Sequence, residues 1–323
     1  MEDNPSILDA IRAGCARVAA LADDIAIDVD RLDAFVDELP IDRLERPSMD
    51  DEHHFAGRGQ ETVAYILILD AINFGSGYFP KLQPLEGRTG YFLVARALRD
   101  HFAEKGPISA EELKALTAED CASLFGQRLD EPEPRELMEH FATALRDLGA
   151  LVLERYQGRF TALVEAADHS ASRLVEILSQ MPLYRDVAKY RGFEVPLFKR
   201  AQITVADLHL GLSGEGWGHF EDLHQLTMFA DNQVPHVLRV NGILHYSEHL
   251  ASLIESGVYL ERDSSEEVEI RACGLHAVDL IVDRLAEKGV DTTAMAVDNY
   301  LWDIGEYPPY TESAKHRTKT TYY

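Results

Sequence analysis

Apolar residues recur every three or four positions through almost the whole of this 323-residue chain. That spacing places them on one face of an α-helix. Runs of alternating β-branched residues are nearly absent, and so are the dipeptides that turn β-hairpins. The sequence therefore predicts an all-α protein, a globular multi-helix fold.

Two segments near the amino end show the helical pattern. One face of a first predicted helix carries Ile7, Ile11, Cys15 and Val18. A second helix is predicted over residues 28–39, with Leu32, Phe35 and Val36 facing inward. Pro40 should end it, because proline cannot continue a helix.

The most apolar segment is a predicted helix over residues 61–73, followed by Gly75. Its run VAYILILDAI, residues 63–72, should be buried and central. The run is shorter than the roughly 20 residues that a membrane span needs, and it contains Asp70. We therefore expect no membrane association.

The charge of the chain limits its partners. It has 31 Lys and Arg against 56 Asp and Glu, a formal net charge of −25. Polymeric nucleic acid is bound mainly through its phosphates, so a duplex or an RNA strand is excluded as the expected partner. Residues 185–200 and 315–323 are locally basic. They are either ordinary surface charge or a recognition site for a small anion.

The chain has three cysteines, Cys15, Cys121 and Cys273, which lie far apart in sequence. They form neither a disulfide framework nor a thiolate zinc cluster, and they fit reduced intracellular thiols. The acidic amino end does not resemble a signal peptide. These features lead us to expect a cytoplasmic protein.

A metal-binding pattern is present at His245 and His249, because HYSEH matches the HxxEH spacing of a zinc peptidase. Such a site needs both histidines on one continuous helix. Ser247 is a natural helix N-cap, which would leave His245 outside the helix. We therefore expect capping and no metal.

A second candidate is the linker His53-His54-Phe55. A loop histidine beside an aromatic residue suits a ligand pocket, and it equally suits a solvated linker.

The third candidate is Asp231, which follows the apolar run at residues 226–230 and precedes the helix expected at Pro235. A carboxylate there would be partly desolvated and supported by the helix dipole. That arrangement fits a catalytic acid, and it also fits an ordinary N-cap.

Several longer motifs then occur in one order, and together they resemble the queuosine salvage proteins, which are queuosine 5′-monophosphate N-glycosidases. The matching stretches are DAINFGSGYFP (70–80), KRAQITVADL (199–208), FEDLHQLTMFADNQVPHVLR (220–239), EVEIRACGLHAVDLI (267–281), DNYLWD (298–303) and the terminal TYY.

The resemblance implies an all-helical fold related to helix-hairpin-helix DNA glycosylases. It also implies hydrolysis of the bond between the 7-deazaguanine base queuine and ribose 5-phosphate. The aspartate of FAD and the lysine of KRAQ, here Asp231 and Lys199, are the implied catalytic residues. Asn73, Phe74 and Ser76 should help form the base pocket, although GSGYFP replaces a tryptophan-containing sequence of some relatives.

The matched stretches, the linker and the basic tail supply the other candidate substrate-binding residues. These are His53, Phe55, Asp207, Arg271, Trp302, Arg317, Tyr322 and Tyr323. We expect the two terminal tyrosines to fold back over the site, although chain ends usually fray.

The chemistry of the implied reaction fits these residues. Cleavage of an N-glycoside passes through an oxocarbenium-like sugar, which Asp231 can stabilise or trap covalently. A 7-deaza base has no N7 to protonate, so stacking and hydrogen bonds to its other edges matter more. We expect a small nucleotide substrate, no cofactor, no metal and no obligatory protein partner.

For the organisation of the chain we expect one helical enzyme unit over residues 1–323. The alternative is a scaffold with a base-pocket segment over 1–180 and a catalytic half over 181–323. Two functional alternatives stay open. One is a DNA or RNA glycosylase-like enzyme acting on another nucleotide, and the other is a non-enzymatic helical binding module.

Overall fold

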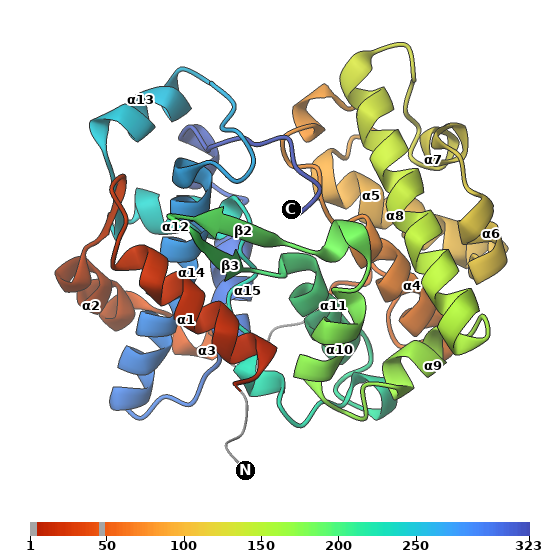
Figure 1. Ribbon diagram of the computed structural model, residues 1–323, viewed down its shortest axis with the longest axis horizontal. Helices are drawn as coiled ribbons and strands as arrows, with labels where there is room; N and C mark the ends of the chain where they lie inside the picture. The colour runs from red at the N-terminus through yellow and green to blue at the C-terminus, as the bar shows by residue number, and fades with distance from the viewer. Residues whose placement is uncertain (1–4, 45–48) are drawn as a thin grey trace. The chain divides into compact units, whose positions relative to one another are not determined.

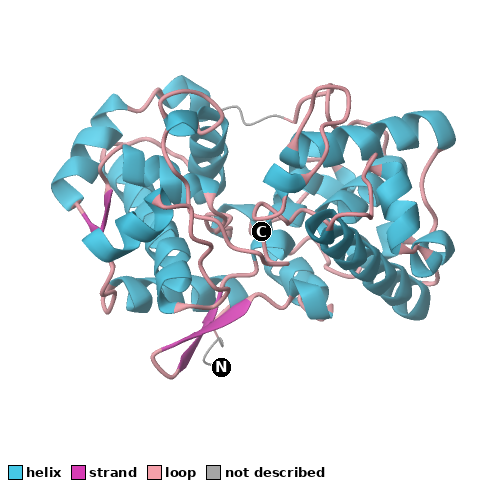
Figure 2. Ribbon diagram, turned by 90° about the horizontal axis from the view of Figure 1, so that it is seen from above, coloured by secondary structure: helices cyan, strands magenta, loops and turns pink. Residues whose placement is uncertain are grey.

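The computed structural model describes residues 5–44 and 49–323, and it confirms a mostly helical protein with short strands (Figures 1 and 2). The chain divides into two compact units. Described residues of the first unit are 5–44, 186–199 and 224–319, and those of the second are 49–185, 200–223 and 320–323. Each unit takes residues from both sides of position 180. A single enzyme unit, or two halves divided near that position, stays a prediction.

The first unit is built from helices and two small antiparallel sheets. Its elements are α1 (Ile7–Ala19), β1 (Ile25–Ile27), α2 (Val29–Glu38), α3 (Ile41–Leu44), β2 (Val187–Tyr190), β3 (Phe193–Pro196), α12 (Gln233–Val240), β4 (Leu244–Tyr246), α13 (Glu248–Glu255), α14 (Ser265–Glu287), α15 (Ala294–Ile304) and the 3-10 turn η5 (Tyr310–Glu312).

Helix α14 is the centre of this unit, and α1, α2, α12 and α15 pack around it. Helix α1 begins with a capping box, in which Ser6 and Asp9 satisfy each other's backbone N–H groups. Leu8 is buried on α1, whereas Ile7, predicted to face inward, is only half-buried. Helix α2 ends at Glu38, and its three predicted inward residues are buried, as expected.

The hairpin β2–β3 is the main element that sequence patterns missed. Tyr190 pairs with Phe193 across a turn at Arg191 and Gly192, whose φ angles are 45° and 87°. Gly192 adopts this left-handed conformation without steric cost. Arg-Gly is not a strong hairpin signal, and each strand has only four residues.

The second unit contains most of the remaining helices. They are α4 (Gln60–Ala71), α5 (Gly90–Lys105), α6 (Ala110–Ala115), α7 (Ala118–Leu124), α8 (Pro132–Tyr156), α9 (Phe160–Glu165), α10 (Ala171–Leu178), the part of α11 (Lys199–Gly211) after its first residue, and the 3-10 turns η1 (Phe79–Lys81), η2 (Pro182–Tyr184) and η3 (Gly216–Gly218). The turn η4 (Leu223–Gln225) lies where the two units meet along the chain.

Helix α4 is buried from Thr62 to Ala71 and packs against α5, α8 and α9, which confirms the predicted central helix (Figure 1). It ends at Ala71, two residues earlier than predicted. The chain then turns, with the Asn73 N–H donating to the Asp70 carbonyl. Gly75 has a φ of 112°, and a Cβ there would lie 2.7 Å from Leu137 Cδ1, so this tight turn requires glycine.

Across the described stretches, no helix combines the length and the apolar character that crossing a membrane requires.

Candidate functional site

Asp231 lies at the amino end of α12, as the sequence predicted. Its Oδ1 accepts the N–H groups of Gln233 at 2.8 Å and Val234 at 3.2 Å. The side chain therefore caps α12 one residue before the geometric N-cap, Asn232, which makes no side-chain cap bond. Asp231 Oδ2 accepts no hydrogen bond from the described residues. One carboxylate oxygen is thus anchored, and the other is available for chemistry.

A buried ion pair fixes the backbone beside Asp231. Arg271 of α14 binds Asp186 through both terminal nitrogens, at 3.0 and 2.6 Å. Its Nε donates to the Ala230 carbonyl at 2.9 Å. The Lys199 N–H donates to the Asp186 carboxylate at 3.2 Å. The pair therefore connects both candidate catalytic segments, and substrate contact by Arg271 stays a prediction.

Asp298 of α15, the first residue of the motif DNYLWD, contacts the segment that leads into Asp231. Its Oδ1 accepts the Phe229 N–H at 2.9 Å. Burial, followed by the charge of Asp231, raises the pKa of Asp298 well above its ordinary value, and Lys199 acts in the opposite direction. Asp231 and Lys199 thus both act on Asp298. Trp302 is one helical turn further along α15, where it is half-buried.

Lys315 is a further charged group near Asp231. Its Nζ donates to Gln233 Oε1, and Gln233 Nε2 donates to Glu306 at 2.7 Å. Burial lowers the pKa of Lys315, whereas the charges of Asp231 and Glu306 raise it. Lys315 therefore compensates two neighbouring carboxylates within the first unit.

The segment around Arg317 runs along the first unit and does not fray there. The Asn232 side chain donates to the His316 carbonyl at 3.3 Å, and the Leu260 N–H donates to the Arg317 carbonyl at 2.9 Å. The side chain of Arg317 is exposed. Its backbone is thus fixed while its guanidinium faces solvent.

In the second unit, Asn73 and Phe74 follow α4 directly. Asn73 Nδ2 donates to Asp70 Oδ1 at 3.1 Å. The Phe74 ring meets Phe141 edge-on at 5.2 Å between centroids, and the Arg200 guanidinium lies 4.7 Å from the centroid of the Phe74 ring. Two candidate pocket residues are therefore held in defined positions.

Ser76 belongs to the same turn. Its Oγ is buried and has no hydrogen-bond partner in the described structure. A buried hydroxyl without a partner is costly, so such a group needs an explanation. A bound ligand or water at Ser76 would supply one.

The carboxy end folds back onto this turn. The Gly75 N–H donates to the main-chain oxygen of Tyr323 at 2.9 Å, and Tyr323 is buried. Tyr322 is half-buried. The prediction that the terminus packs and does not fray is confirmed, and contact of the two tyrosines with substrate stays a prediction.

The linker residue His53 has partners at both ring nitrogens. Its Nδ1 is 2.9 Å from Asp50 Oδ1, and Arg88 Nε is 3.4 Å from its Nε2. Phe55 packs against Tyr65 and Phe102, with ring centroids 6.0 and 5.7 Å apart. The linker is therefore packed against the second unit.

The neighbouring residue His54, part of the candidate linker but not of the predicted substrate-binding residues, is the more deeply buried histidine. Burial lowers the pKa of His54. Its Nδ1 donates to the Asp50 carbonyl at 3.0 Å, so the neutral ring accepts the Tyr91 hydroxyl at Nε2, 2.8 Å away. Burial, followed by the charge of Asp207, raises the pKa of Tyr91, so Asp207 lies near this pair.

The HxxEH pattern does not form a metal site. His245 lies in β4, and Ser247 caps α13 by accepting the Leu250 N–H at 3.1 Å, as predicted. Within residues 5–44 and 49–323, no three His, Cys, Asp or Glu side chains form a group that could hold a metal ion.

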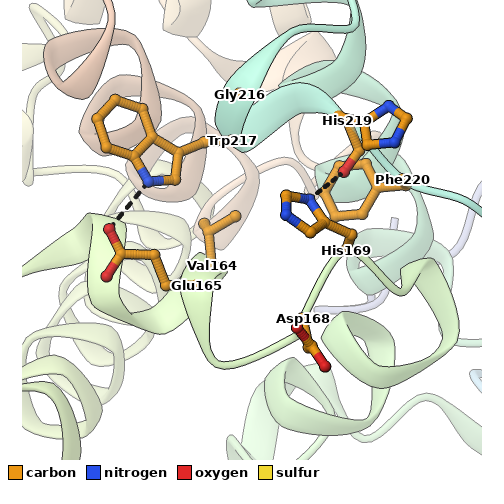
Figure 3. Close-up of a pocket in the computed structure, with 8 residues that line it drawn as sticks. All are labelled: Val164, Glu165, Asp168, His169, Gly216, Trp217, His219 and Phe220. Carbon is orange, nitrogen blue, oxygen red and sulfur yellow. Dashed lines mark hydrogen bonds between the residues drawn. The ribbon is translucent and has the colours of Figure 1, made fainter.

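A surface pocket of about 330 Å³ lies in the second unit (Figure 3). It is lined by Val164, Glu165, Asp168, His169, Gly216, Trp217, His219 and Phe220. Part of its wall comes from residues 216–220, where Trp217 Nε1 donates to Glu165 Oε1 at 3.0 Å. None of the candidate site residues lines this pocket, so we do not place the substrate there.

The structure thus groups the candidate residues in two sets, one in each unit. In the first unit, Asp231 and Lys199 act on the same carboxyl group, and Arg271 supports both of their segments. Asn73, Phe74, Ser76 and Tyr323 meet at one turn of the second unit. His53, Phe55 and Asp207 lie in the second unit, around the linker and its tyrosine neighbours.

Comparison with known proteins identifies a family and several relatives that this sequence resembles. The profile of a family described as "Queuosine salvage protein" matches residues 53–323. The chain is 35% identical over 312 residues to the queuosine 5′-phosphate N-glycosylase/hydrolase of Sphaerobacter thermophilus, with 95% of each chain covered. The protein of that name from Mus musculus is 33% identical, with 84% of this chain and 85% of the relative covered. That from Dictyostelium discoideum is 32% identical, with coverage of 81% and 78%.

Proposed function

Because the chain belongs to the queuosine salvage protein family, we propose that it hydrolyses queuosine 5′-phosphate. Water adds to the sugar C1′, the bond from C1′ to the base breaks, and the base leaves with a proton as queuine. Ribose 5-phosphate is the second product. The observation that carries this function is the match to enzymes of that name along nearly the whole chain.

We assign the sugar end of the reaction to Asp231. The C1′ centre becomes positively charged as the base departs, and a fixed carboxylate stabilises that charge. Asp231 Oδ1 is held by two backbone N–H groups, so its Oδ2 keeps a constant direction. Little reorganisation is then needed when the charge develops.

Lys199 and Arg271 have different parts in this proposal. The Lys199 ammonium supplies positive charge near Asp298, and we assign it to an anionic or electron-rich group of the substrate. The Arg271 guanidinium is bound to Asp186 and to the Ala230 carbonyl, so it holds Asp231 in place. We therefore propose Lys199 as a catalytic residue and Arg271 as a positioning residue.

We assign the base end to the turn after α4. Phe74 is buried against Phe141 and the Arg200 guanidinium and fixes the turn, and the buried Ser76 hydroxyl offers a hydrogen bond without a competing partner. A 7-deaza base cannot be activated at N7, so contacts to its remaining polar edges stabilise the leaving group instead. We assign one such contact to Ser76.

The phosphate is assigned to the exposed guanidinium of Arg317. Its backbone is fixed by the bond from Leu260, whereas the side chain faces solvent. Lys315 is less suited to the phosphate because Gln233 and the nearby carboxylates already engage its ammonium. A charge-assisted bond to phosphate selects the nucleotide over the nucleoside.

The direct test is to incubate the purified protein with queuosine 5′-monophosphate and to quantify released queuine by chromatography. Guanosine 5′-monophosphate is the matched control substrate, because it carries the same sugar phosphate and a different base. Release of queuine in preference to guanine supports the proposal. No release of queuine at any enzyme concentration would reject it.

A further inference from the structure

Asp298 holds the backbone that carries Asp231. It lies on α15, is only 3% exposed, and accepts the Phe229 N–H at 2.9 Å. Phe229 is two residues before Asp231. The Ala230 carbonyl, which belongs to the peptide group that joins Ala230 to Asp231, accepts the bond from Arg271 at 2.9 Å. Two buried side chains from two helices therefore fix two peptide groups of the short segment that leads into Asp231.

Asp298 and Asp231 are neighbouring carboxyls in different surroundings. Asp231 accepts two N–H groups at a helix amino end and has Lys315 nearby. Asp298 accepts one N–H and is buried. Burial disfavours the charged form of a carboxyl, so the surroundings of Asp298 favour its protonated form.

The groups around Asp298 determine the direction in which its pKa shifts. Helices α3, α12 and α14 pack against α15. Among described residues, the ionised groups that act on Asp298 are Asp231, which raises its pKa, and Lys199, which lowers it; burial is the largest cause and raises it. The net direction is a raised pKa of Asp298, which favours its protonated form.

We propose that Asp298 is a positioning residue that acts as a neutral carboxylic acid. Its carbonyl oxygen holds the Phe229 N–H and thereby aims Asp231 at the sugar, and its proton is not transferred during the reaction. This inference rests on the proposed hydrolysis of queuosine 5′-phosphate. It assigns a supporting function to a residue outside the candidate catalytic pair.

The test compares Asp298→Asn with Asp298→Glu. Asparagine keeps a neutral acceptor oxygen at the same distance from the backbone, whereas glutamate keeps the acid and displaces it by one methylene. We expect kcat of Asp298→Asn within about threefold of the parent and kcat of Asp298→Glu at least about 30-fold lower. KM should change by less than about threefold in both variants, because Asp298 aims a catalytic group and binds no substrate.

A second readout does not depend on activity. The pKa of Asp298 is raised above its ordinary value of 3.8, so the folded protein holds this proton more tightly than the unfolded chain. The resulting stabilisation is complete below pH 3.8 and is lost as pH rises toward the folded pKa. The unfolding midpoint of the parent, relative to Asp298→Asn, should therefore fall as pH rises from about 4 to 7. Asp291→Asn, an exposed change just before α15, is the matched control and should follow the parent at every pH.

The outcomes separate the two proposals. If the parent itself releases no queuine, the proposed function fails, and the pH dependence of unfolding still tests the charge of Asp298. If the parent is active and Asp298→Asn is as inactive as Asp298→Glu, or if only Asp298→Glu stays active, Asp298 does not act as a neutral acceptor. If Asp298→Asn and the parent unfold in parallel across the pH range, Asp298 is ionised and the inference is wrong.

Discussion

The surroundings of Asp231 are rich in charged side chains, whereas the turn after α4 is mainly aromatic and uncharged. Near Asp231 lie charged side chains, namely the Arg271–Asp186 ion pair and Lys315, whose pKa burial lowers although the charges of Asp231 and Glu306 oppose that shift. At the turn after α4, Phe74 packs among aromatic rings and one hydroxyl lacks a partner. One region is therefore dominated by charged groups, and the other leaves a hydrogen bond unmade.

An N-glycoside likewise has two chemically different halves. The sugar becomes a cation during cleavage, so it needs fixed negative charge with no freedom to reorganise. The base is planar and carries polar edges, so it needs stacking surface and free hydrogen-bonding groups. The comparison predicts that changes near Asp231 reduce kcat or stability, and that changes at the turn after α4 affect KM.

The largest expected effect follows from Asp231→Asn. The amide keeps the shape of the side chain but removes the negative charge that stabilises the sugar cation. We expect kcat to fall by at least about 10⁴-fold, equivalent to ~5.4 kcal/mol of barrier, with KM nearly unchanged. Steady-state release of queuine measures both constants. Activity within about tenfold of the parent would exclude the assigned role.

The second prediction concerns the ion pair that supports Asp231. Arg271→Ala leaves Asp186 buried without its partner, which should lower the free energy of unfolding by about 3–5 kcal/mol. Denaturant titration measures the loss. Arg284→Ala is the control, because Arg284 lies on the same helix and pairs with Asp33 at the surface. Equal destabilisation by both changes would mean that the buried ion pair contributes no more to the free energy of unfolding than the surface pair.

The local pattern of the sequence predicted the helices well and the long-range pairings poorly. Helices α1, α2 and α4 follow from apolar spacing, because that signal lies within each segment. The β1–β4 pairing joins Ile25 to Tyr246, and neither strand reveals its partner. The fold class was therefore accessible from sequence, whereas the sheets were not.

For the site, the sequence identified individual residues but not the contacts that connect them. Asp231 was identified from its position before a helix and from its motif. Asp186 was missed, because its importance comes from Arg271, 85 positions away. Asp298 was missed because a polar residue within a helix usually marks an exposed face, and only the tertiary structure shows that it is buried.

The third prediction separates phosphate recognition from chemistry. Arg317→Ala should lower kcat/KM for queuosine 5′-monophosphate by about 10- to 100-fold, because a charge-assisted bond to phosphate is lost. The value for queuosine, which has no phosphate, should not change. Measuring both substrates with both proteins gives the test. An equal loss on the two substrates would place Arg317 outside the phosphate site.

The smallest effect is expected for Ser76→Ala. This change should weaken substrate binding without weakening the fold, which distinguishes the turn after α4 from the surroundings of Asp231. The Ser76 hydroxyl is buried without a partner, so its removal should leave the unfolding midpoint unchanged or raise it slightly. KM for queuosine 5′-monophosphate should rise by about three- to tenfold, since the base loses one hydrogen bond. Thr292→Val is the matched control, because Thr292 also has a buried hydroxyl without a partner and lies outside the candidate site. A rise in KM with Ser76→Ala alone would identify this turn as part of the base pocket, whereas an unchanged KM would remove Ser76 from it.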